Sequence, residues 1–388
     1  MIRIKKKENC CGCGACKNIC PQNAITFLPD EKGDLYPIVS DDLCVNCNLC
    51  EKVCPIITPI VNQINYNPKA YAAWNNNVGE RMKSTSGGVF PLLANIILEN
   101  GGYVVGVQYE DDYTVSHTVI SQNEELKKIC KTKYVQSSNN GVYTQIKELL
   151  EDNKTVLYSG TPCQVAGLKS FLQKEYEKLY TIELFCHGVI NQIVFNRYLK
   201  SIEKHSKSKI TSVEFRNKRN GWSKSATVVS LENGTEYCKS NEDEYLMGYL
   251  RYNLYIRPSC TDCKYKSFPR VADLSLGDLW GIEKLFDNHD NKGASAVIVN
   301  SEKGALLFKQ IEKGLFIKEI SIYFLKENNP SLVQSYRIGK YSEYFYRKFQ
   351  KTDFIDLIQK IKYKDTVSSK DNNFMGKIMI TKNYLLGK

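Results

Sequence analysis

The sequence predicts a mixed α/β (α+β) protein made of a small cysteine-rich module, a larger domain and a basic helical tail. Nine of the 15 cysteines fall within residues 10–54, a density that indicates a module organised by its cysteines. After residue 70, short apolar segments of strand length alternate with segments of helical periodicity, as in mixed α/β domains. We therefore expect four regions: a module over 1–62, a linker over 63–69, a large domain over 70–330 and a tail over 331–388.

Eight of the N-terminal cysteines form two copies of the spacing C-x2-C-x2-C-x3-C-P. This is the spacing of bacterial ferredoxins, in which three cysteines of one copy bind one 4Fe-4S cluster and the fourth binds the other. Zinc knuckles use pairs of ligands, and so dense a disulfide framework is unusual in a chain of 388 residues. Cys11 has no place in the pattern. We predict two 4Fe-4S clusters: cluster I on Cys10, Cys13, Cys16 and Cys54, and cluster II on Cys20, Cys44, Cys47 and Cys50.

The composition excludes some classes of function. Hydrophobic residues make up 42% and charged residues 24%, as in soluble globular proteins, and no apolar run is long enough to predict a transmembrane segment. The chain starts without the apolar segment of a signal peptide, so we expect a cytoplasmic protein. The net charge of +11 falls to about +7 when each cluster with its four thiolates counts as −2. Residues 331–388 hold most of this excess, and since no nucleic-acid-binding motif accompanies it, we expect no nucleic-acid partner.

Secondary-structure patterns are clear along most of the chain. The segment between the two cysteine runs predicts two short strands around a turn, which suits a small ferredoxin-like module. The tail has aromatic and aliphatic residues at helical spacing over 341–364. In the large domain the predicted strands are 70–74, 103–109, 156–159, 181–185, 210–215, 226–231 and 296–299, and the predicted helices are 89–99, 142–150, 165–172, 193–202, 244–251 and 304–312.

Four further cysteines fall where strands or loops of the large domain would expose them. Cys163 follows a strand and a Gly-Thr-Pro turn, Cys186 ends another strand, and Cys260 and Cys263 share one loop. Since strand ends of an α/β sheet meet at one edge, these four thiolates predict a third tetrahedral site. The spacing fits zinc, with His187 as a substitute ligand, as well as it fits a third 4Fe-4S cluster. The two N-terminal clusters favour a cluster, while a structural role as small buried residues also fits Cys163 and Cys186.

Four segments of the large domain suit a phosphorylated, planar cofactor. Residues 84–88 precede a helix, where hydroxyl and N–H groups bind phosphate, although Ser-Gly-Gly is also an ordinary helix N-cap. Residues 131–137 combine two lysines, an aromatic ring and an amide, which also fits a solvated loop. The turn 215–222 has three cations and a tryptophan, and the acidic segment 273–281 predicts either a ligand loop or a tight turn. The candidate cofactor-binding residues here are Ser84, Ser86, Gly87, Gly88, Lys133, Tyr134, Gln136, Ser137, Arg216, Trp222 and Asp278.

Together these segments resemble the coenzyme F420 hydrogenase/dehydrogenase beta-subunit family of flavin-dependent iron-sulfur proteins. The resemblance covers residues 70 to about 300 and leaves the tail out. It implies a bound FAD near the Ser-Gly-Gly segment at 86–88 and the Lys-Tyr segment at 133–134, with Thr161 as a further contact. It also implies a third 4Fe-4S cluster on Cys163, Cys186, Cys260 and Cys263. The motifs that carry it are STSGGVF at 84–90, KYVQS at 133–137, GTPCQ at 160–164, FCHG at 185–188, FR to GW over 215–222, RPSC-x2-C at 257–263 and GDLWG at 277–281.

The resemblance implies an iron-sulfur flavoprotein oxidoreductase. We expect electrons to pass from a soluble ferredoxin-type donor through 4Fe-4S clusters to FAD and on to a small organic substrate, with surface-polysaccharide metabolism as one setting. One alternative is an F420-dependent oxidoreductase, and another is a non-catalytic electron-relay subunit of a larger redox complex. His187 is a candidate proton donor, or it only orients Cys186. Lys133 is the second candidate catalytic residue.

The basic tail has three alternative roles. We expect the tail to dock on the rest of the chain through its apolar face. Formation of a homo-oligomer is the second alternative. Weak peripheral contact with an anionic membrane surface is the third, because basic helices with aromatic residues bind such surfaces.

Overall fold

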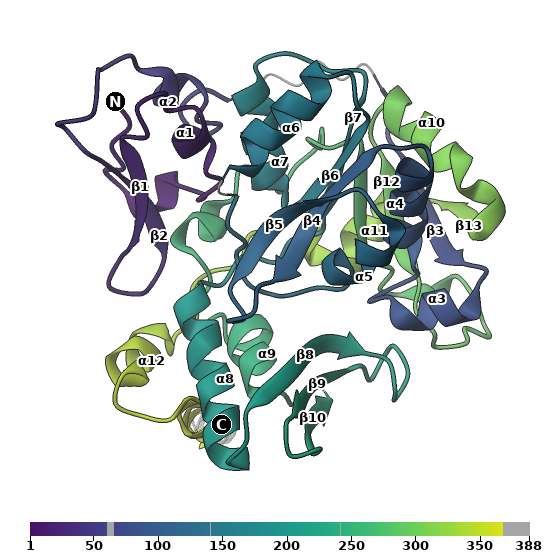
Figure 1. Ribbon diagram of the computed structural model, residues 1–388. Coiled ribbons are helices and arrows are strands. Elements are labelled where there is room, and N and C mark those ends of the chain that lie inside the picture. The colour runs from purple at the N-terminus through teal and green to yellow at the C-terminus, as the bar shows by residue number, and fades with distance from the viewer. Residues whose placement is uncertain (60–65, 140, 241, 368–388) are drawn as a thin grey trace, which may run out of the picture.

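The computed structural model describes residues 1–59, 66–139, 141–240 and 242–367 (Figure 1). Residues 63–65 of the predicted linker and the end of the predicted tail lie outside these residues. In the described part, the N-terminal module packs on one side of a domain built on a large sheet, and a smaller sheet with its own helices lies at one end of that domain.

The N-terminal module is a β-hairpin with one short helix for each cysteine run. β1 (Ile25–Pro29) and β2 (Leu35–Val39) pair antiparallel, which confirms the two predicted strands. Their turn is closed by Asp30, whose Oδ1 accepts hydrogen bonds from the backbone N–H groups of Lys32 and Asp34. The remaining elements are η1 (Lys7–Asn9), α1 (Ala15–Asn18) and α2 (Leu49–Lys52).

The large domain is built on a mixed sheet of eight strands in the order β13-β3-β12-β11-β7-β6-β4-β5. Four neighbours in the middle, β11, β7, β6 and β4, run parallel, and the outer strands join them antiparallel. This confirms the mixed α/β class. The strands are β3 (Lys69–Asn75), β4 (Tyr103–Tyr109), β5 (Val115–Ile120), β6 (Val156–Gly160), β7 (Leu179–Leu184), β11 (Leu274–Asp278), β12 (Ser295–Val299) and β13 (Leu315–Ile320).

Helices cover both faces of this sheet. On one face, α4 (Val89–Glu99) and α10 (Glu302–Gln310) bury their apolar residues against alternate strand residues. On the other, α6 (Val142–Glu151) and α7 (Pro162–Leu172) form a core that also contains residues of the N-terminal module. The module is therefore attached through the face that carries α6 and α7 (Figure 1). The shorter elements are α3 (Val78–Lys83), η2 (Asn123–Glu125), α5 (Leu126–Ile129), η5 (Ile282–Lys284), η6 (Glu312–Gly314), α11 (Ile322–Asn328) and η7 (Pro330–Leu332).

A second, three-stranded sheet forms a smaller unit with a core of its own. β8 (Ile210–Asn217), β9 (Ala226–Leu231) and β10 (Glu236–Ser240) pair antiparallel and pack on α8 (Gln192–Ser206). The chain then returns to the large sheet by three short elements, α9 (Glu244–Leu246), the π-helical η3 (Met247–Arg251) and η4 (Pro258–Asp262).

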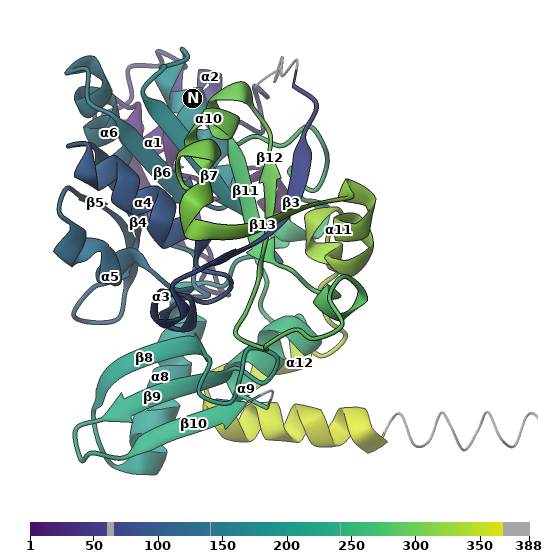
Figure 2. The same ribbon diagram turned by 90° about the vertical axis from the view of Figure 1, so that its right-hand side faces the viewer.

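The described part of the tail completes the core of this smaller unit. α12 (Ser342–Phe349) and the helical residues 354–367 lie against α8 and the three-stranded sheet (Figure 2). Phe345, Phe349 and Phe354 are buried together with Phe195 and Tyr245. Docking is thus what the structure shows for the tail up to residue 367, and residues 368–388 lie outside the described part. None of the helices in the described residues has the length and apolar character needed to cross a membrane.

Two differences from the sequence pattern change the surroundings of the predicted site. The segment 273–281, predicted as a loop or turn, contains β11, a buried strand in the middle of the sheet that ends at Asp278. The helix predicted from residue 165 starts at Pro162, because Thr161 and Gln164 form a capping box, so Cys163 lies in the first helical turn. β5, β10 and β13 were also not predicted.

Replacement of Phe345 by alanine tests the docking of the tail. Phe345 is fully buried and its ring packs on Tyr255 and Phe354, so the substitution should lower the free energy of unfolding by about 3–5 kcal/mol in denaturant titrations. Tyr363→Ala is the control, since Tyr363 is 72% exposed and its loss should change stability by less than about 0.5 kcal/mol. Equal, small effects of both substitutions would show that the tail is not docked.

Candidate functional site

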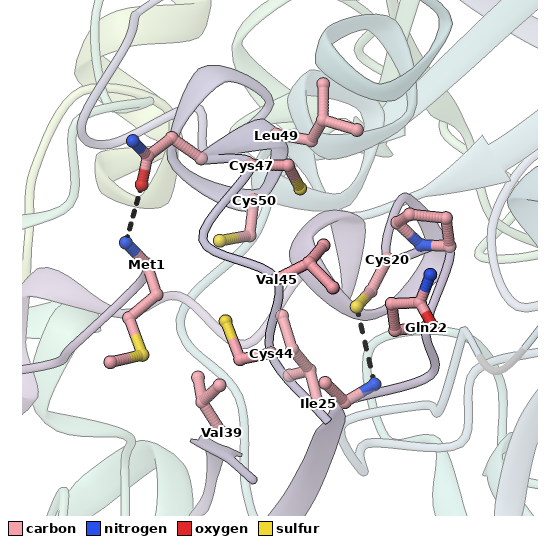
Figure 3. Close-up of a pocket in the computed structure, with 13 residues that line it drawn as sticks. Met1, Cys20, Gln22, Ile25, Val39, Cys44, Val45, Cys47, Leu49 and Cys50 are labelled. Carbon is pink, nitrogen blue, oxygen red and sulfur yellow. Dashed lines mark hydrogen bonds between the residues drawn. The ribbon is translucent and has the colours of Figure 1, made fainter. Parts of the chain in front are cut away.

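The four cysteines assigned to cluster II surround one hollow of ≈ 370 Å³ in the N-terminal module. Figure 3 shows the sulfur atoms of Cys20, Cys44, Cys47 and Cys50 grouped around it. Two backbone N–H groups donate to these sulfurs, from Ile2 to Cys50 Sγ at 3.3 Å and from Ala24 to Cys20 Sγ at 3.3 Å. Cys47 is exposed, so a cluster in this hollow would lie at the protein surface.

The cysteines assigned to cluster I line a second hollow of ≈ 310 Å³. Cys10, Cys13, Cys16 and Cys54 are all buried there. Burial, reinforced by the neighbouring thiols, raises the pKa of Cys16 and of Cys54. A set of buried thiols fits a metal cluster, because the metal ions replace the protons that burial otherwise retains. The two hollows therefore bring the cysteines together in the two predicted sets, including the exchange of Cys20 and Cys54 between the runs.

Cys11, to which the sequence pattern gave no role, lies at the contact between the module and the large domain. Its buried thiol is hydrogen-bonded with those of Cys13 and Cys163. Its carbonyl oxygen accepts a hydrogen bond from Gln136 Nε2 at 3.0 Å. Cys11 thus connects the cluster I hollow with one of the four cysteines of the large domain.

Cys163, Cys186, Cys260 and Cys263, called here the third cysteine set, converge at one edge of the large sheet. Cys163 follows β6, Cys186 follows the adjacent parallel strand β7, and Cys260 lies in η4. The Arg257 N–H donates to Val189 O at 3.0 Å and holds the η4 loop beside the segment that follows Cys186. Burial raises the pKa of the Cys260 thiol, and so do the nearby thiols of Cys186, Cys163 and Cys263.

The spacing of these four sulfur atoms bears on the choice between zinc and a cluster. Tetrahedral zinc with Zn–S bonds of about 2.3 Å needs sulfur atoms about 3.8 Å apart. In the described part of the chain, the only group of three or more His, Cys, Asp or Glu residues whose ligand atoms all lie within 4.8 Å of one another is His205, Asp353 and Asp356. The sulfur atoms of the third cysteine set are therefore spread more widely than a zinc ion requires.

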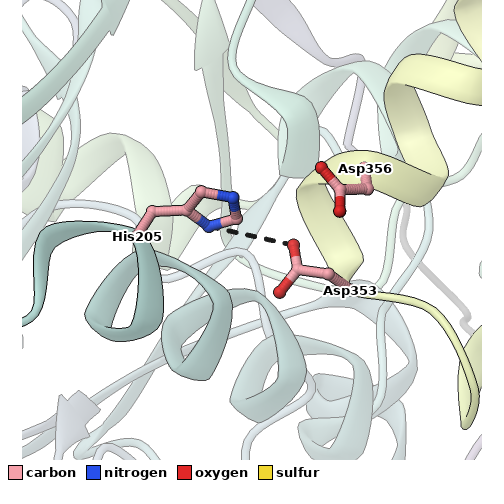
Figure 4. Close-up of side chains that lie close together, drawn as sticks. All are labelled: His205, Asp353 and Asp356. Carbon is pink, nitrogen blue, oxygen red and sulfur yellow. Dashed lines mark ion pairs between the residues drawn. The ribbon is translucent and has the colours of Figure 1, made fainter.

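The His205 group has a structural explanation (Figure 4). His205 Nδ1 lies 2.8 Å from Ser201 O, and Asp353 Oδ1 accepts hydrogen bonds from Ser201 Oγ and the Ile355 N–H. These bonds attach the tail to α8. Local hydrogen bonding accounts for the positions of His205 and Asp353 without a metal ion.

The same edge of the large sheet, at the end of β11, also brings together several of the predicted cofactor-binding residues. Arg216 Nη2 donates to Asp278 Oδ2 at 2.8 Å, and Trp222 Nε1 donates to Asp278 Oδ1 at 3.3 Å. The Trp222 ring stacks on Trp280 with centroids 5.0 Å apart, and the Arg216 guanidinium lies over the Trp280 ring. We call Arg216, Trp222, Asp278 and Trp280 the sheet-edge site.

The segment Ser84–Gly88 is packed tightly beside the sheet-edge site. Ser86 Oγ donates to Ala294 O at 2.6 Å, and the Gly87 N–H donates to Ser295 Oγ at 3.0 Å. Lys218 Nζ donates to the carbonyl oxygens of Ser86 and Arg81, and burial lowers the pKa of Lys218 to about 7. Gly88, with φ of +81°, is the N-cap of α4, and no side chain caps the first N–H groups of that helix.

Several non-glycine residues around the site have left-handed backbone conformations. Tyr134, Arg216 and Asn253 have φ of 48°, 61° and 47°. At Arg216 this conformation accompanies a register shift between β8 and β9. Such conformations cost about 1–3 kcal/mol each and persist where surrounding structure holds a side chain in a required position.

Four other predicted residues are bonded to protein groups. Lys133 Nζ donates to the carbonyl oxygens of residues 128, 130 and 131, and burial lowers its pKa to about 8. Gln136 bonds to Cys11 and Arg257, and Ser137 bonds to His117 and Gln164. Thr161 Oγ1 caps α7 and lies 3.2 Å from Cys163 Sγ. In this structure Lys133 holds its own loop, whereas Gln136 and Thr161 hold segments that adjoin the third cysteine set.

His187 lies beside the third cysteine set in an enclosed position. Its Nε2 is 2.7 Å from Asn253 Oδ1, and its ring stacks on Tyr336. Burial lowers the pKa of His187 to about 4, although the bond to Asn253 opposes this. The neutral ring with an Nε2–H donated to Asn253 fits the orienting role more closely than proton donation.

Two family profiles match the chain. The profile for the C terminus of the coenzyme F420 hydrogenase/dehydrogenase beta subunit matches residues 153–322, and the profile "4Fe-4S dicluster domain" matches residues 9–56. Residues 153–322 are therefore similar to the C-terminal part of this beta-subunit family. The family match includes every residue of the third cysteine set and of the sheet-edge site, and the family resemblance predicted from the motifs is confirmed.

Three proteins of methanogens are similar to this chain. The coenzyme F420-dependent sulfite reductase of Methanocaldococcus jannaschii is 25% identical over 319 residues, which cover 80% of this chain and 47% of that protein. The F subunit of the F(420)H(2) dehydrogenase of Methanosarcina mazei is 21% identical, with coverage of 82% and 87%. The beta subunit of the F420-dependent formate dehydrogenase of M. jannaschii is 26% identical, with coverage of 54% and 49%. The chain thus spans about half the length of two of these relatives.

One solved structure similar to this chain is the F420-reducing [NiFe] hydrogenase complex from Methanosarcina barkeri. The similarity has a TM-score of 0.45 and 18% sequence identity, and it covers 76% of this chain and 90% of the matched chain.

Replacement of Gly87 by alanine tests the close packing beside the sheet-edge site. A Cβ at Gly87 would lie 2.4 Å from Ala73 O and 2.6 Å from Ser295 N, so β3 and β12 must separate, at a cost of about 1–3 kcal/mol in unfolding free energy. Gly314→Ala is the matched control, because its Cβ would meet only Leu92 at ordinary contact distance. Thermal unfolding that gave the same result for both variants would contradict the packing described here.

Proposed function

We propose that this protein is the iron-sulfur, flavin-binding subunit of an F420-dependent oxidoreductase. The names of the three relatives all include F420, which favours this alternative over the expected transfer of electrons to another organic substrate. The match to the beta-subunit family and the match to the dicluster domain also support the proposal. The chain's own substrate and partners remain part of the proposal.

The observation that supports the proposal most directly is a continuous row of aromatic residues between the third cysteine set and the sheet-edge site. Tyr249 donates to Gly188 O at 2.7 Å, beside Cys186, and its ring contacts His187. Tyr249 and Tyr134 have ring centroids 5.8 Å apart. Tyr134 in turn contacts Phe215, the residue before Arg216. A row of packed rings would therefore connect a metal centre on the third cysteine set with a planar cofactor at the sheet-edge site.

The residues of the chain suit these two groups in different ways. The 4Fe-4S clusters supply single-electron transfer, and a flavin supplies the conversion between single electrons and hydride. Arg216 and Lys218 provide positive charge for a phosphorylated ligand, and the N-terminus of α4 adds free N–H groups. Trp280, which is partly exposed, offers a ring face for stacking. We assign FAD to this edge.

The third cysteine set is proposed to hold a third 4Fe-4S cluster. Its buried thiols, its wide sulfur spacing and the adjacent Lys266 support a cluster, because the cation offsets a net charge of about −2. Lys266 Nζ donates to the carbonyl oxygens of Cys186 and Ser331. The ammonium group is therefore held beside the thiolates. His187 is assigned the role of fixing the Cys186 loop.

Iron content tests the third cluster. Protein purified without oxygen should hold about twelve iron atoms per chain, and Cys260→Ser should lower this to about eight while the EPR signals of clusters I and II persist. Cys238→Ser is the control, since Cys238 is exposed and outside the three sets, and it should keep about twelve. About eight iron atoms and one zinc in the unmodified protein would contradict the assignment.

Arg216 tests the F420 reaction. Arg216→Met removes the charge that pairs with Asp278 and stacks on Trp280, so flavin content should fall, and kcat/KM for F420, followed by its absorbance, should fall by at least about tenfold. Arg219→Met is the matched control from the same turn, because the Arg219 ion pair with Glu236 is exposed. Flavin that is reduced by ferredoxin but never exchanges electrons with F420 would contradict the proposal and favour another acceptor.

A further inference from the structure

Arg257 is a fully buried cation whose hydrogen bonds run mostly to another part of the chain. None of its surface is exposed. Its Nε donates to Cys10 O at 2.9 Å, and its Nη2 donates to Leu35 O at 2.8 Å and to Cys10 Sγ at 3.6 Å. The guanidinium also lies over the Tyr36 ring, 4.5 Å from its centroid. All these partners belong to the N-terminal module, although Arg257 is in the large domain.

The remaining contacts of Arg257 lie within the large domain. Its Nη1 donates to Gln136 Oε1 at 3.1 Å, and Gln136 donates in turn to Cys11 O. Its backbone N–H bonds to Val189, and Pro258 follows immediately and starts η4, which carries Cys260. Arg257 therefore connects a ligand of cluster I directly with the loop of the third cysteine set.

The electrostatic surroundings leave the guanidinium charge close to cluster I. The buried Asp34 carboxylate interacts electrostatically with Arg257, and its pKa is raised by burial and lowered by Arg257. Burial of a guanidinium is costly unless anionic groups compensate it. The thiolate of Cys10, a ligand assigned to cluster I, is a second anionic group beside Arg257. A cluster on these thiolates becomes more negative by one charge when it is reduced.

We propose that Arg257 raises the reduction potential of cluster I, through its charge and its N–H···S bond to Cys10, and does so only when the N-terminal module is docked on the large domain. Hydrogen bonds to the sulfur ligands and local charge are the means by which proteins set such potentials. The added electron is stabilised by a nearby cation, so cluster I is favoured as the electron-accepting neighbour of the exposed cluster II. The proposal rests on the part of the proposed function that assigns clusters I and II, and it does not depend on flavin or F420.

The test is an EPR-monitored redox titration of the full-length, cluster-loaded protein. In Arg257→Met the potential of cluster I should become more negative, with about tenfold less reduced cluster at a given solution potential, which corresponds to about 59 mV for one electron. Cluster II, whose ligands do not touch Arg257, should keep its potential. Arg257→Lys keeps the charge and should shift cluster I less than Arg257→Met does.

Asp34→Asn gives a second test with the opposite sign. Loss of the carboxylate leaves the Arg257 charge less compensated, so the cluster I potential should become more positive. This variant keeps Arg257, and it therefore serves where Arg257→Met does not fold. Asn18→Ala is the control: it removes a different bond between the two domains, from Asn18 Nδ2 to Asn139 O, and should change neither potential.

The outcomes distinguish an effect of Arg257 on the cluster I potential from a purely structural contact between the two domains. Unchanged cluster I potentials in Arg257→Met and Asp34→Asn, with iron content intact, would overturn the proposal and leave Arg257 as a structural contact. Equal shifts of both clusters would also overturn it, because they would indicate a general change of the module. Since the titration observes the clusters directly, failure of the F420 assay would not affect the result.

Discussion

The assembly of the site depends on the close approach of Cys13 to helix α7. A Cβ at Gly167 would lie 2.7 Å from Cys13 Cβ and 2.9 Å from its sulfur, so only glycine allows this approach. Cys163 lies four residues earlier on α7 and hence on the same face of the helix. One packing contact thus determines how near cluster I can be to the third cysteine set, and Cys11 fills the space between them.

Buried cations accompany this route from the module to the sheet-edge site. Arg257, Lys266 and Lys218 are each largely enclosed, and each donates to backbone carbonyl oxygens. A carbonyl satisfies the hydrogen-bonding capacity of a cation without cancelling its charge, so positive potential remains available to anionic groups. The positive net charge of the chain therefore includes buried cations inside the protein as well as the excess of basic residues in the tail. Clusters with a net charge of about −2 and a phosphorylated cofactor are the anions that this potential suits.

Local patterns in the sequence predicted the features that local geometry decides. The two cysteine runs and the helix 89–99 could be read from spacing and periodicity, because their ligands or apolar faces recur within one or two turns. β11 could not, since Ser275, Gly277 and Asp278 are typical of loops, and only its position between β7 and β12 makes it a strand. Long-range contacts explain the other differences.

The roles of Gln136 and Arg257 also depend on long-range contacts that local sequence patterns do not predict. Gln136 was a reasonable cofactor candidate by residue type, but its partner Cys11 lies 125 residues away in sequence. Arg257 belongs to a recognisable motif, and yet its partners in the module become apparent only when the two domains are packed together. Spacing carries no information about such docking.

The position of the tail has a consequence for the order in which the chain folds. Phe345, Phe354 and Ile358 fill the core formed by α8 and the three-stranded sheet, which end more than a hundred residues before them in the sequence. During synthesis, that sheet emerges with an open apolar face and stays incomplete until the C-terminal helices follow. The smaller unit is inserted in the sequence between β7 and β11. We therefore expect the large sheet and the smaller sheet to reach their final packing together, once the C-terminal helices have been added. A ribosome that stops before residue 340 would therefore release a chain with an exposed apolar surface, which is a substrate for chaperones and proteases.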